Sequence, residues 1–295
     1  MLQHALGSYL SLGSIAFPDI DPVIFSVGPF AVRWYGLAYV AGFVGAAWVA
    51  YRLSRRWEVG LTVDDVLNLM LACVAGVVIG SRVFYVVVYG AGYYWDNPAD
   101  IVAIWDGGMA WHGGFLGIIA AGLIYAKVRN VPFLTLADLA AVGAPIGFFF
   151  GRIANFVNGE LWGRQTDMPW GVVFGGAAGE VARHPSQLYE AFLEGLVMFL
   201  VLLWLARKPR PQAFFFGMFM LMYGVFRLAT EFVREPDVQI GFLFGSLTMG
   251  QLLSIPLAVG GAAVVWWSLT RVRRSGPPAS STGPDAPGTS RPRPE

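Results

Sequence analysis

Residues 248–270 read TMGQLLSIPLAVGGAAVVWWSLT, a run with no Asp, Glu, Lys or Arg. A helix needs about 20 mostly apolar residues to cross the hydrocarbon core of a bilayer. This run therefore predicts a membrane-spanning helix, and three basic residues follow it directly: Arg271, Arg273 and Arg274. Six further stretches meet the same criterion approximately: 33–52, 66–89, 112–128, 136–157, 187–206 and 213–233. The sequence predicts an all-α polytopic membrane protein with seven transmembrane helices.

The composition of the whole chain agrees with a membrane protein and excludes several other classes. The 295 residues are 56% hydrophobic and 13% charged, whereas an average soluble domain is about 25% charged. A soluble enzyme, a disordered chain and a coiled coil are therefore excluded. The 20 Lys+Arg against 19 Asp+Glu give no basic excess for binding nucleic acid. With one cysteine, Cys73, and three widely spaced histidines, we expect neither an intrachain disulfide nor a metal site.

Basic residues are concentrated at one set of helix ends, and this sets the expected orientation. The ends that follow the first, third, fifth and seventh stretches, with the tail, hold 13 of the 20 Lys and Arg residues. Because basic loops stay cytoplasmic, we expect the N-terminus outside and the C-terminus in the cytoplasm. Segments 90–111 and 158–186 are then extra-cytoplasmic. Residues 1–274 form one membrane domain, and 275–295, rich in Pro, Gly and Ser, form a disordered cytoplasmic tail.

A buried arginine marks the outer end of the fourth stretch, where residues 151–164 read GRIANFVNGELWGR. A charge at bilayer depth costs from about 2.5 to over 10 kcal/mol, so such residues are functional candidates. Arg152 and Asn155 share a helix face, and Glu160 lies just beyond the helix, within reach of the same cavity. The arginine fork suits a lipid phosphate. The alternative is an Arg–Glu pair that only holds the loop against the helix.

The sixth stretch carries a second polar face. Tyr223, Arg227 and Glu231 are spaced by four residues and therefore lie above one another on a helix. A self-contained pair between Arg227 and Glu231 is the structural alternative, but it explains neither Tyr223 nor Arg234. We expect Glu160 and Glu231 to be the anionic partners of Arg152 and Arg227.

His112 stands at the start of the third stretch, next to two glycines. Because histidine titrates near neutrality, it can accept or relay a proton there; a hydrogen-bonded structural histidine is the alternative. His184 is expected to order the turn before the fifth stretch. Glu190 and Glu194 share a face and are expected to pair with an arginine, with Arg82 as the candidate. Tyr35, taken alone, reads as an aromatic-belt residue.

Together these stretches resemble the prolipoprotein diacylglyceryl transferases of bacteria. The resemblance runs from Asp21 to Ser254, and its most specific parts are 151–164, 105–114, 183–190 and 223–231. It implies a multi-pass protein of the bacterial inner membrane, with its active site towards the extra-cytoplasmic side. It also implies transfer of the diacylglyceryl group of phosphatidylglycerol to the lipobox cysteine thiol of a preprolipoprotein. The products are a thioether and glycerol phosphate.

Carried over by position, the family's important residues are Tyr35, His112, Arg152, Asn155, Glu160, Gly163, Tyr223, Arg227 and Glu231. Of these we expect Arg152 and Arg227 to stabilise the leaving phosphate. His112 is the first candidate base for the thiol, whose free pKa is about 8.5, and the field of the arginines is the second candidate. The other six residues would bind substrate, and no cofactor is expected. A transporter or flippase for an anionic lipid is the alternative function, although the sequence lacks the inverted repeat common in such folds.

Overall fold

The computed structural model describes residues 14–18, 20–28, 30–236, 243 and 247–274. Within that part of the chain, seven helices are long and apolar enough to cross a membrane, which confirms the expected number. Five of them form one group: α1 (Trp34–Arg56), α5 (Phe133–Val157), α6 (Ser186–Glu190) continued through η6 (Ala191–Val197) and α7 (Met198–Leu205), α8 (Phe214–Glu231), and α9 (Met249–Arg274). The other two are α2 (Val63–Phe84), extended by η2 (Tyr85–Tyr89), and α4 (Trp111–Arg129).

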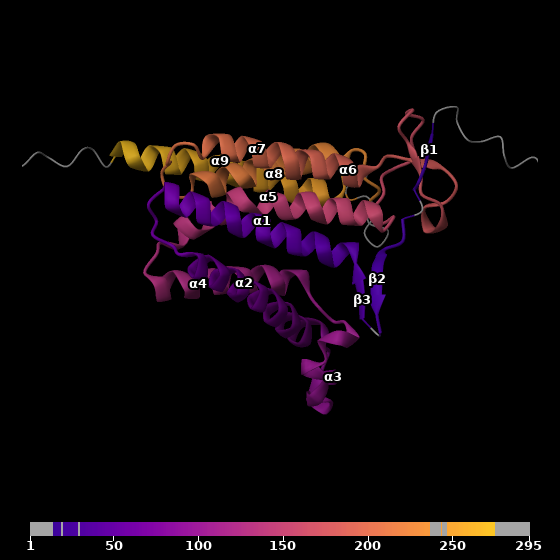
Figure 1. Cartoon of the computed structure of the whole chain (residues 1–295), viewed down its shortest axis with the longest axis horizontal. Coiled ribbons are helices and arrows are strands. Elements are labelled where there is room, and N and C mark those ends of the chain that lie inside the picture. Colours follow the sequence, from indigo (N-terminus) through magenta and orange to yellow (C-terminus); the bar gives the residue numbers. More distant parts are fainter. Residues whose placement is uncertain (1–13, 19, 29, 237–242, 244–246, 275–295) are drawn as a thin grey trace, which may run out of the picture.

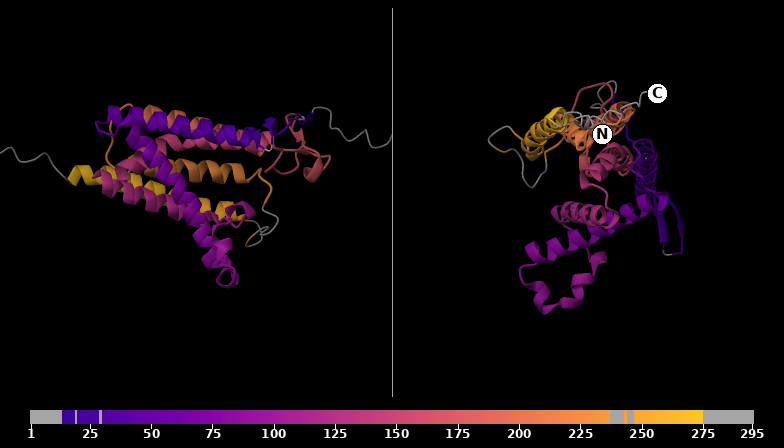
Figure 2. Two further views of the ribbon diagram at one scale, coloured as in Figure 1. Left: turned by 60° about the horizontal axis from the view of Figure 1, so that its bottom comes forward. Right: turned by 90° about the vertical axis from the view of Figure 1, so that its left-hand side faces the viewer.

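Helices α2 and α4 form a pair that stands apart from the other five (Figures 1 and 2). Glycines let their backbones approach closely, since a Cβ at Gly80 would overlap the carbonyl oxygen of Gly113, and one at Gly117 that of Gly76. Small residues at four-residue spacing are typical of packed membrane helices, because the surrounding lipid is as apolar as Leu and only close packing favours contact. Three short helices project beyond this pair: α3 (Tyr93–Asp96), η3 (Pro98–Val102) and η4 (Ile104–Asp106).

One end of the bundle collects the basic helix termini, and we call it the basic end. Trp57 Nε1, just after α1, donates to Ala206 O at 3.3 Å, and Arg129 Nη2 of α4 pairs with Asp65 Oδ1 of α2 at 2.8 Å. Asp138 of α5 accepts hydrogen bonds from the backbone N–H groups at the start of α8. These polar contacts connect the helix ends. Those of Asp138 also satisfy backbone N–H donors that the start of a helix leaves free.

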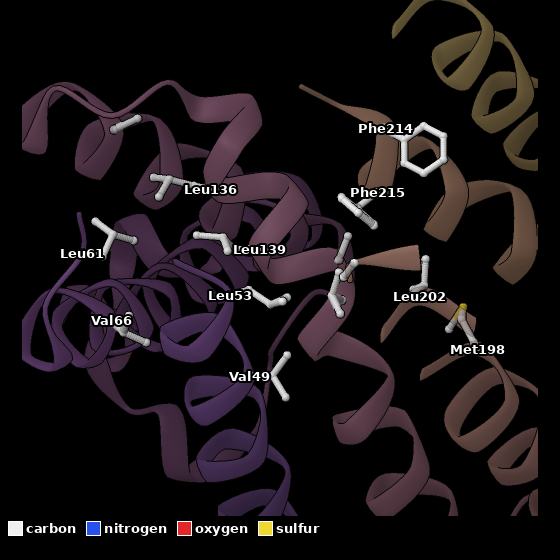
Figure 3. Packing of buried hydrophobic residues seen from close by; sticks show 14 residues of the cluster. Val49, Leu53, Leu61, Val66, Leu136, Leu139, Met198, Leu202, Phe214 and Phe215 are labelled. Carbon is white, nitrogen blue, oxygen red and sulfur yellow. The ribbon is translucent and has the colours of Figure 1, made fainter. Parts of the chain in front are cut away.

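The packed apolar core also lies toward the basic end (Figure 3). Leu53 of α1 and Leu139 of α5 lie between Val66 of α2 and Leu202 of α7, and all four side chains are buried. Elsewhere the helices expose large apolar side chains, as expected for surfaces that face lipid rather than water. The buried apolar cluster therefore lies toward one end of the bundle.

Small strands cover the opposite end, which we call the strand end. β1 (Ile15–Ala16), β4 (Val172–Val173) and β5 (Ala182–Arg183) form one sheet in the order β1-β4-β5, with β1 parallel to β4 and β5 antiparallel to it. β2 (Val23–Val27) and β3 (Phe30–Arg33) form a hairpin in which Val23 pairs with Arg33. A short helix, η5 (Gly176–Ala178), lies between β4 and β5. The chain is therefore mostly helical, and the expectation of an all-α protein missed these strands because they are short and lie outside the apolar runs.

Two helices begin three residues before the expected position. Helix α2 begins at Val63 rather than 66, because Thr62 and Asp65 form a reciprocal capping box. Helix α5 begins at Phe133 rather than 136, directly after Pro132. Hydropathy alone discounts the polar first turn of α2, although its capping hydrogen bonds favour a helix start, whereas α5 starts without a side-chain cap. The expected tail, 275–295, lies outside the described residues.

Candidate functional site

Charged side chains from three separate helices meet at one carboxylate near the strand end. Arg152 Nε of α5 forms an ion pair with Glu190 Oε2 of α6 at 2.7 Å, and Arg227 Nη1 of α8 donates to Glu190 Oε1 at 3.1 Å. Arg234, just beyond α8, donates to the same Oε1 at 3.1 Å. Arg227 also pairs with Glu231 at 2.9 Å. We call these five residues the arginine cluster: Arg152, Glu190, Arg227, Glu231 and Arg234.

The arginine cluster lies below the helix ends rather than on the surface. Arg152 is five residues before the end of α5, and Arg227 is four residues before the end of α8. At 1.5 Å per residue this places both about 6–8 Å inside the bundle. The Glu190 side chain is 0% exposed, whereas Arg152 and Arg227 keep 17% and 15% exposure. The arginine side chains, and not the carboxylate, therefore retain accessible surface.

The 151–164 segment is attached to the end of α8 by the backbone. Arg164 Nε donates to Arg234 O at 2.9 Å, and Gly163 forms an antiparallel bridge with Arg234. Only glycine fits at 163, because a Cβ there would lie 2.8 Å from His184 O and closer still to Val233 O. Gly163 therefore allows two backbone segments to pack closely beside the arginine cluster. It has no side chain that could bind a ligand.

Asn155 and Glu160 form a second polar group beside Arg152. Asn155 Nδ2 donates to Glu160 Oε1 at 2.8 Å, and Gln187 Nε2 donates to the backbone oxygen of Glu160 at 2.6 Å. Glu160 makes no ion pair with Arg152 in the described structure; Glu190 does. The expectation that Glu160 is the partner of Arg152 is wrong, because the turn after α5 directs Glu160 back to Asn155. The expectation for Glu231 and Arg227 is confirmed.

A groove of about 510 Å³ runs between α1 and α5 and ends at these polar groups. Its polar lining comes from Tyr35 and Tyr39 of α1, whose hydroxyls are 3.4 Å apart, and from Arg152 and Asn155 of α5. The remaining lining is small or apolar: Gly42, Phe43, Ala46, Ala144, Gly147, Phe148 and Gly151. A groove with a cationic end and an apolar length matches the two parts of a phospholipid.

Tyr223 lies behind the wall of this groove. Its ring is 5.3 Å from that of Phe148 and stacks on Phe219 at 6.0 Å. Phe148 itself lines the groove. Tyr223 is thus one turn below Arg227 on α8, as the spacing predicts, and is separated from the groove by one aromatic ring.

Glu194 is a buried carboxylate one helical turn beyond Glu190. Its side chain is 0% exposed, neither oxygen accepts a hydrogen bond in the described structure, and Arg152 Nη2 is 3.9 Å away. It stands in η6, a π-helical segment packed on Phe149 through Gly195. Such segments are frequent at functional sites. The expectation that Glu190 pairs with an arginine is confirmed. Sequence reasoning did not place Glu190 in the site, although two glutamates four residues apart in an apolar span were the signal.

Arg82 does not pair with these glutamates, so that expectation is wrong. It donates to four backbone oxygens in the segment before α4, those of Asp100, Ile101, Gly107 and Gly108. Arg82 is on α2, in the helix pair that stands apart from the five that carry the arginine cluster. Its role in the structure is to hold the segment that leads into α4.

The structure does not bring His112 into contact with the arginine cluster. His112 is exposed in the first turn of α4, stacks on Phe84 at 5.8 Å and meets Trp111 edge-on at 5.5 Å. It is not among the residues that line the groove. His184 orders its turn as expected: its Nδ1 is 3.2 Å from the Tyr189 hydroxyl, and burial lowers its pKa.

Fold and site together define a polytopic membrane protein with a buried arginine cluster at the head of a lipid-sized groove. Comparison with known sequences then identifies the family. Residues 22–267 match the family described as prolipoprotein diacylglyceryl transferase, and the chain belongs to this family. This confirms the resemblance drawn from the motifs.

Individual relatives match over nearly their whole length. The chain is 48% identical over 262 residues to the phosphatidylglycerol--prolipoprotein diacylglyceryl transferase of Aliivibrio salmonicida, covering 89% of this chain and 92% of that protein. It is 47% identical to the protein of the same name from Vibrio vulnificus, covering 89% and 96%. For that from Geobacter sulfurreducens the identity is 46%, covering 88% and 99%. The chain is thus a multi-pass membrane protein of a bacterial enzyme family.

Proposed function

We propose that this chain transfers the diacylglyceryl group of phosphatidylglycerol to the thiol of a lipobox cysteine in a preprolipoprotein. The products are a thioether-linked lipid on the protein and glycerol phosphate. The observation that carries the proposal is the arginine cluster, whose Arg152 lines the groove between α1 and α5 and shares Glu190 with Arg227. Membership of the transferase family supports the same function and gives no support to a transporter.

The main catalytic requirement of this reaction is stabilisation of the leaving group. The cysteine sulfur forms a bond to the terminal glycerol carbon of the diacylglycerol, and the bond between that carbon and the phosphate oxygen breaks. The bonding electrons leave with glycerol phosphate. Arg152 and Arg227 bind the phosphate and stabilise this developing charge in a site with little water. The attacked carbon is saturated, so no oxyanion hole for a carbonyl is required.

The remaining residues position the lipid. Tyr35 and Asn155 line the groove next to Arg152, and Glu160 orients Asn155 through their hydrogen bond. Glu231 holds the guanidinium of Arg227, and Tyr223 supports the groove wall. Gly163 keeps the 151–164 segment against the end of α8. None of these roles needs a cofactor, because the phosphodiester of the lipid already supplies the leaving group, glycerol phosphate.

The thiol proton must leave before or during the attack. His112 is the base in this proposal, and its exposed ring is free to meet an incoming peptide. Since it stands on α4, away from the arginine cluster on α5, α6 and α8, the peptide has to lie between the two helix groups. The positive field of the arginines, which favours a thiolate, is the second route to deprotonation.

The orientation in the membrane follows from the charges at the basic end. We place that end in the cytoplasm, in keeping with the positive-inside rule; the N-terminus is then outside and the C-terminus inside. The protein resides in the bacterial inner membrane, with the arginine cluster open to the extra-cytoplasmic side. Residues 1–274 act as one membrane domain, and 275–295 form a cytoplasmic tail.

The proposal is tested by supplying both substrates to detergent-purified protein. Phosphatidylglycerol and a synthetic lipobox peptide should give a thioether adduct detected by mass spectrometry, and glycerol phosphate in equal amount. A peptide with serine in place of the cysteine is the matched control and should give neither product. Movement of lipid between leaflets of a vesicle without any adduct would contradict the proposal in favour of a transporter.

A further inference from the structure

Three cationic side chains of the arginine cluster converge on the single carboxylate of Glu190. Oε2 forms an ion pair with Arg152 at 2.7 Å, and Oε1 accepts hydrogen bonds from both Arg227 and Arg234 at 3.1 Å. The three arginines come from α5, from α8 and from the segment after α8. Like charges this close repel one another strongly in a medium of low dielectric constant. Their convergence therefore depends on the carboxylate between them.

The geometry leaves donors on each guanidinium for a ligand. A guanidinium has five N–H donors, and Glu190 takes one contact from each arginine. The Glu190 side chain is 0% exposed, while those of Arg152, Arg227 and Arg234 are 17%, 15% and 12% exposed. The carboxylate is thus buried while the three arginine side chains keep some accessible surface, and Arg152 lines the groove. A lipid phosphate would meet arginines that are already oriented.

We propose that Glu190 is a positioning residue of the transfer reaction, which holds Arg152, Arg227 and Arg234 as one preorganised phosphate site. This inference rests on the proposed function. It adds that the catalytic geometry of the arginines depends on a carboxylate that does not touch the lipid. Glu190 acts through the arginines, and its loss lowers turnover without weakening the binding of the lipid.

The direction of the effect on each kinetic constant follows from the charges. Glu190→Gln keeps the size of the side chain and removes one negative charge, so the arginine cluster becomes more positive. Phosphatidylglycerol then binds at least as well, and KM for the lipid falls. The guanidinium groups lose their common anchor, and a misplacement of about 1 Å lowers kcat about a hundredfold. A purely structural ion pair would instead reduce the yield of folded protein, without lowering both kcat and KM of the protein that folds.

Glu194 provides a matched control on the same helix. It is equally buried, one turn away, and its nearest cation is Arg152 Nη2 at 3.9 Å. Because neither Glu194 oxygen accepts a hydrogen bond and its ion pair with Arg152 is long, Glu194→Gln should keep kcat within about threefold of the wild type. Glu190→Asp keeps the charge but shortens the side chain, so its kcat should lie between those of the wild type and Glu190→Gln.

The experiment measures kcat and KM for phosphatidylglycerol with the lipobox peptide, using full-length variants that elute as one peak in size exclusion. We expect Glu190→Gln to have a low kcat and a lowered KM, and Glu194→Gln to have a kcat close to that of the wild type. A Glu190→Gln kcat within about threefold of the wild type, or a loss seen only as a raised KM, overturns the inference. If Glu190→Gln does not fold, Glu190→Asp is compared with Glu194→Asp, and equal kcat values overturn it. A wild type that makes no adduct overturns the proposed function as well.

Discussion

Replacing Arg152 or Arg227 by lysine should lower turnover strongly while leaving the protein folded. Arg152 uses Nε for Glu190 and points Nη2 toward Glu194, and Arg227 uses Nη1 for Glu190 and Nη2 for Glu231. A lysine has a single ammonium group and cannot hold a carboxylate while it presents a planar fork to phosphate. Loss of one preorganised charge-stabilising donor costs about 2–4 kcal/mol in the transition state. This corresponds to a decrease in kcat of roughly 30- to 1000-fold.

The assay is adduct formation at saturating phosphatidylglycerol, so that only turnover is compared. Arg129→Lys is a suitable control, because Arg129 is 47% exposed and pairs with Asp65 at the basic end, far from the arginine cluster; its kcat should be unchanged. Exchanging the charges of Arg227 and Glu231 should not restore activity, because a glutamate at 227 would face Glu190. Turnover near that of the wild type in either lysine variant, or in the exchange, would remove that arginine from the catalytic role.

Three further predictions concern topology, the base and the packing at Gly163. A reporter fused after Arg210 should report a cytoplasmic position and one inserted near Gly176 an extra-cytoplasmic one; reversed signals would place the arginine cluster on the wrong side. His112→Gln should fold normally but turn over slowly near pH 7, with partial recovery at higher pH as the thiol ionises by itself; normal activity at pH 6.5–7 would remove His112 as the base. Gly163→Ala should lower stability by about 1–3 kcal/mol, because its Cβ overlaps two carbonyl oxygens; an unchanged melting temperature would show that the backbone moves aside easily.

The apolar runs determine the membrane helices because the bilayer allows few other structures. Every backbone polar group within the hydrocarbon must be hydrogen-bonded inside the protein, so a run such as 248–270 has to be a helix wherever it packs. The same rule made Arg152, Arg227 and Glu231 conspicuous in the sequence, since charge is costly at that depth. Spacing of four residues sufficed to pair Arg227 with Glu231, because both stand on one helix.

Contacts between helices were decided by the tertiary structure alone. The sequence shows Glu190 as a glutamate in an apolar stretch. Its three arginine partners lie 37, 38 and 44 positions away in the chain. No local sequence pattern indicates which helices are in contact. The sequence therefore favoured Glu160 for Arg152 and Arg82 for Glu190, each plausible by charge and wrong by geometry. Helical periodicity determines which side chains share a face of one helix, whereas the packing of α5 against α6 and α8 determines which faces meet. The arginine cluster is a product of that packing, since its carboxylate and its cations come from different helices.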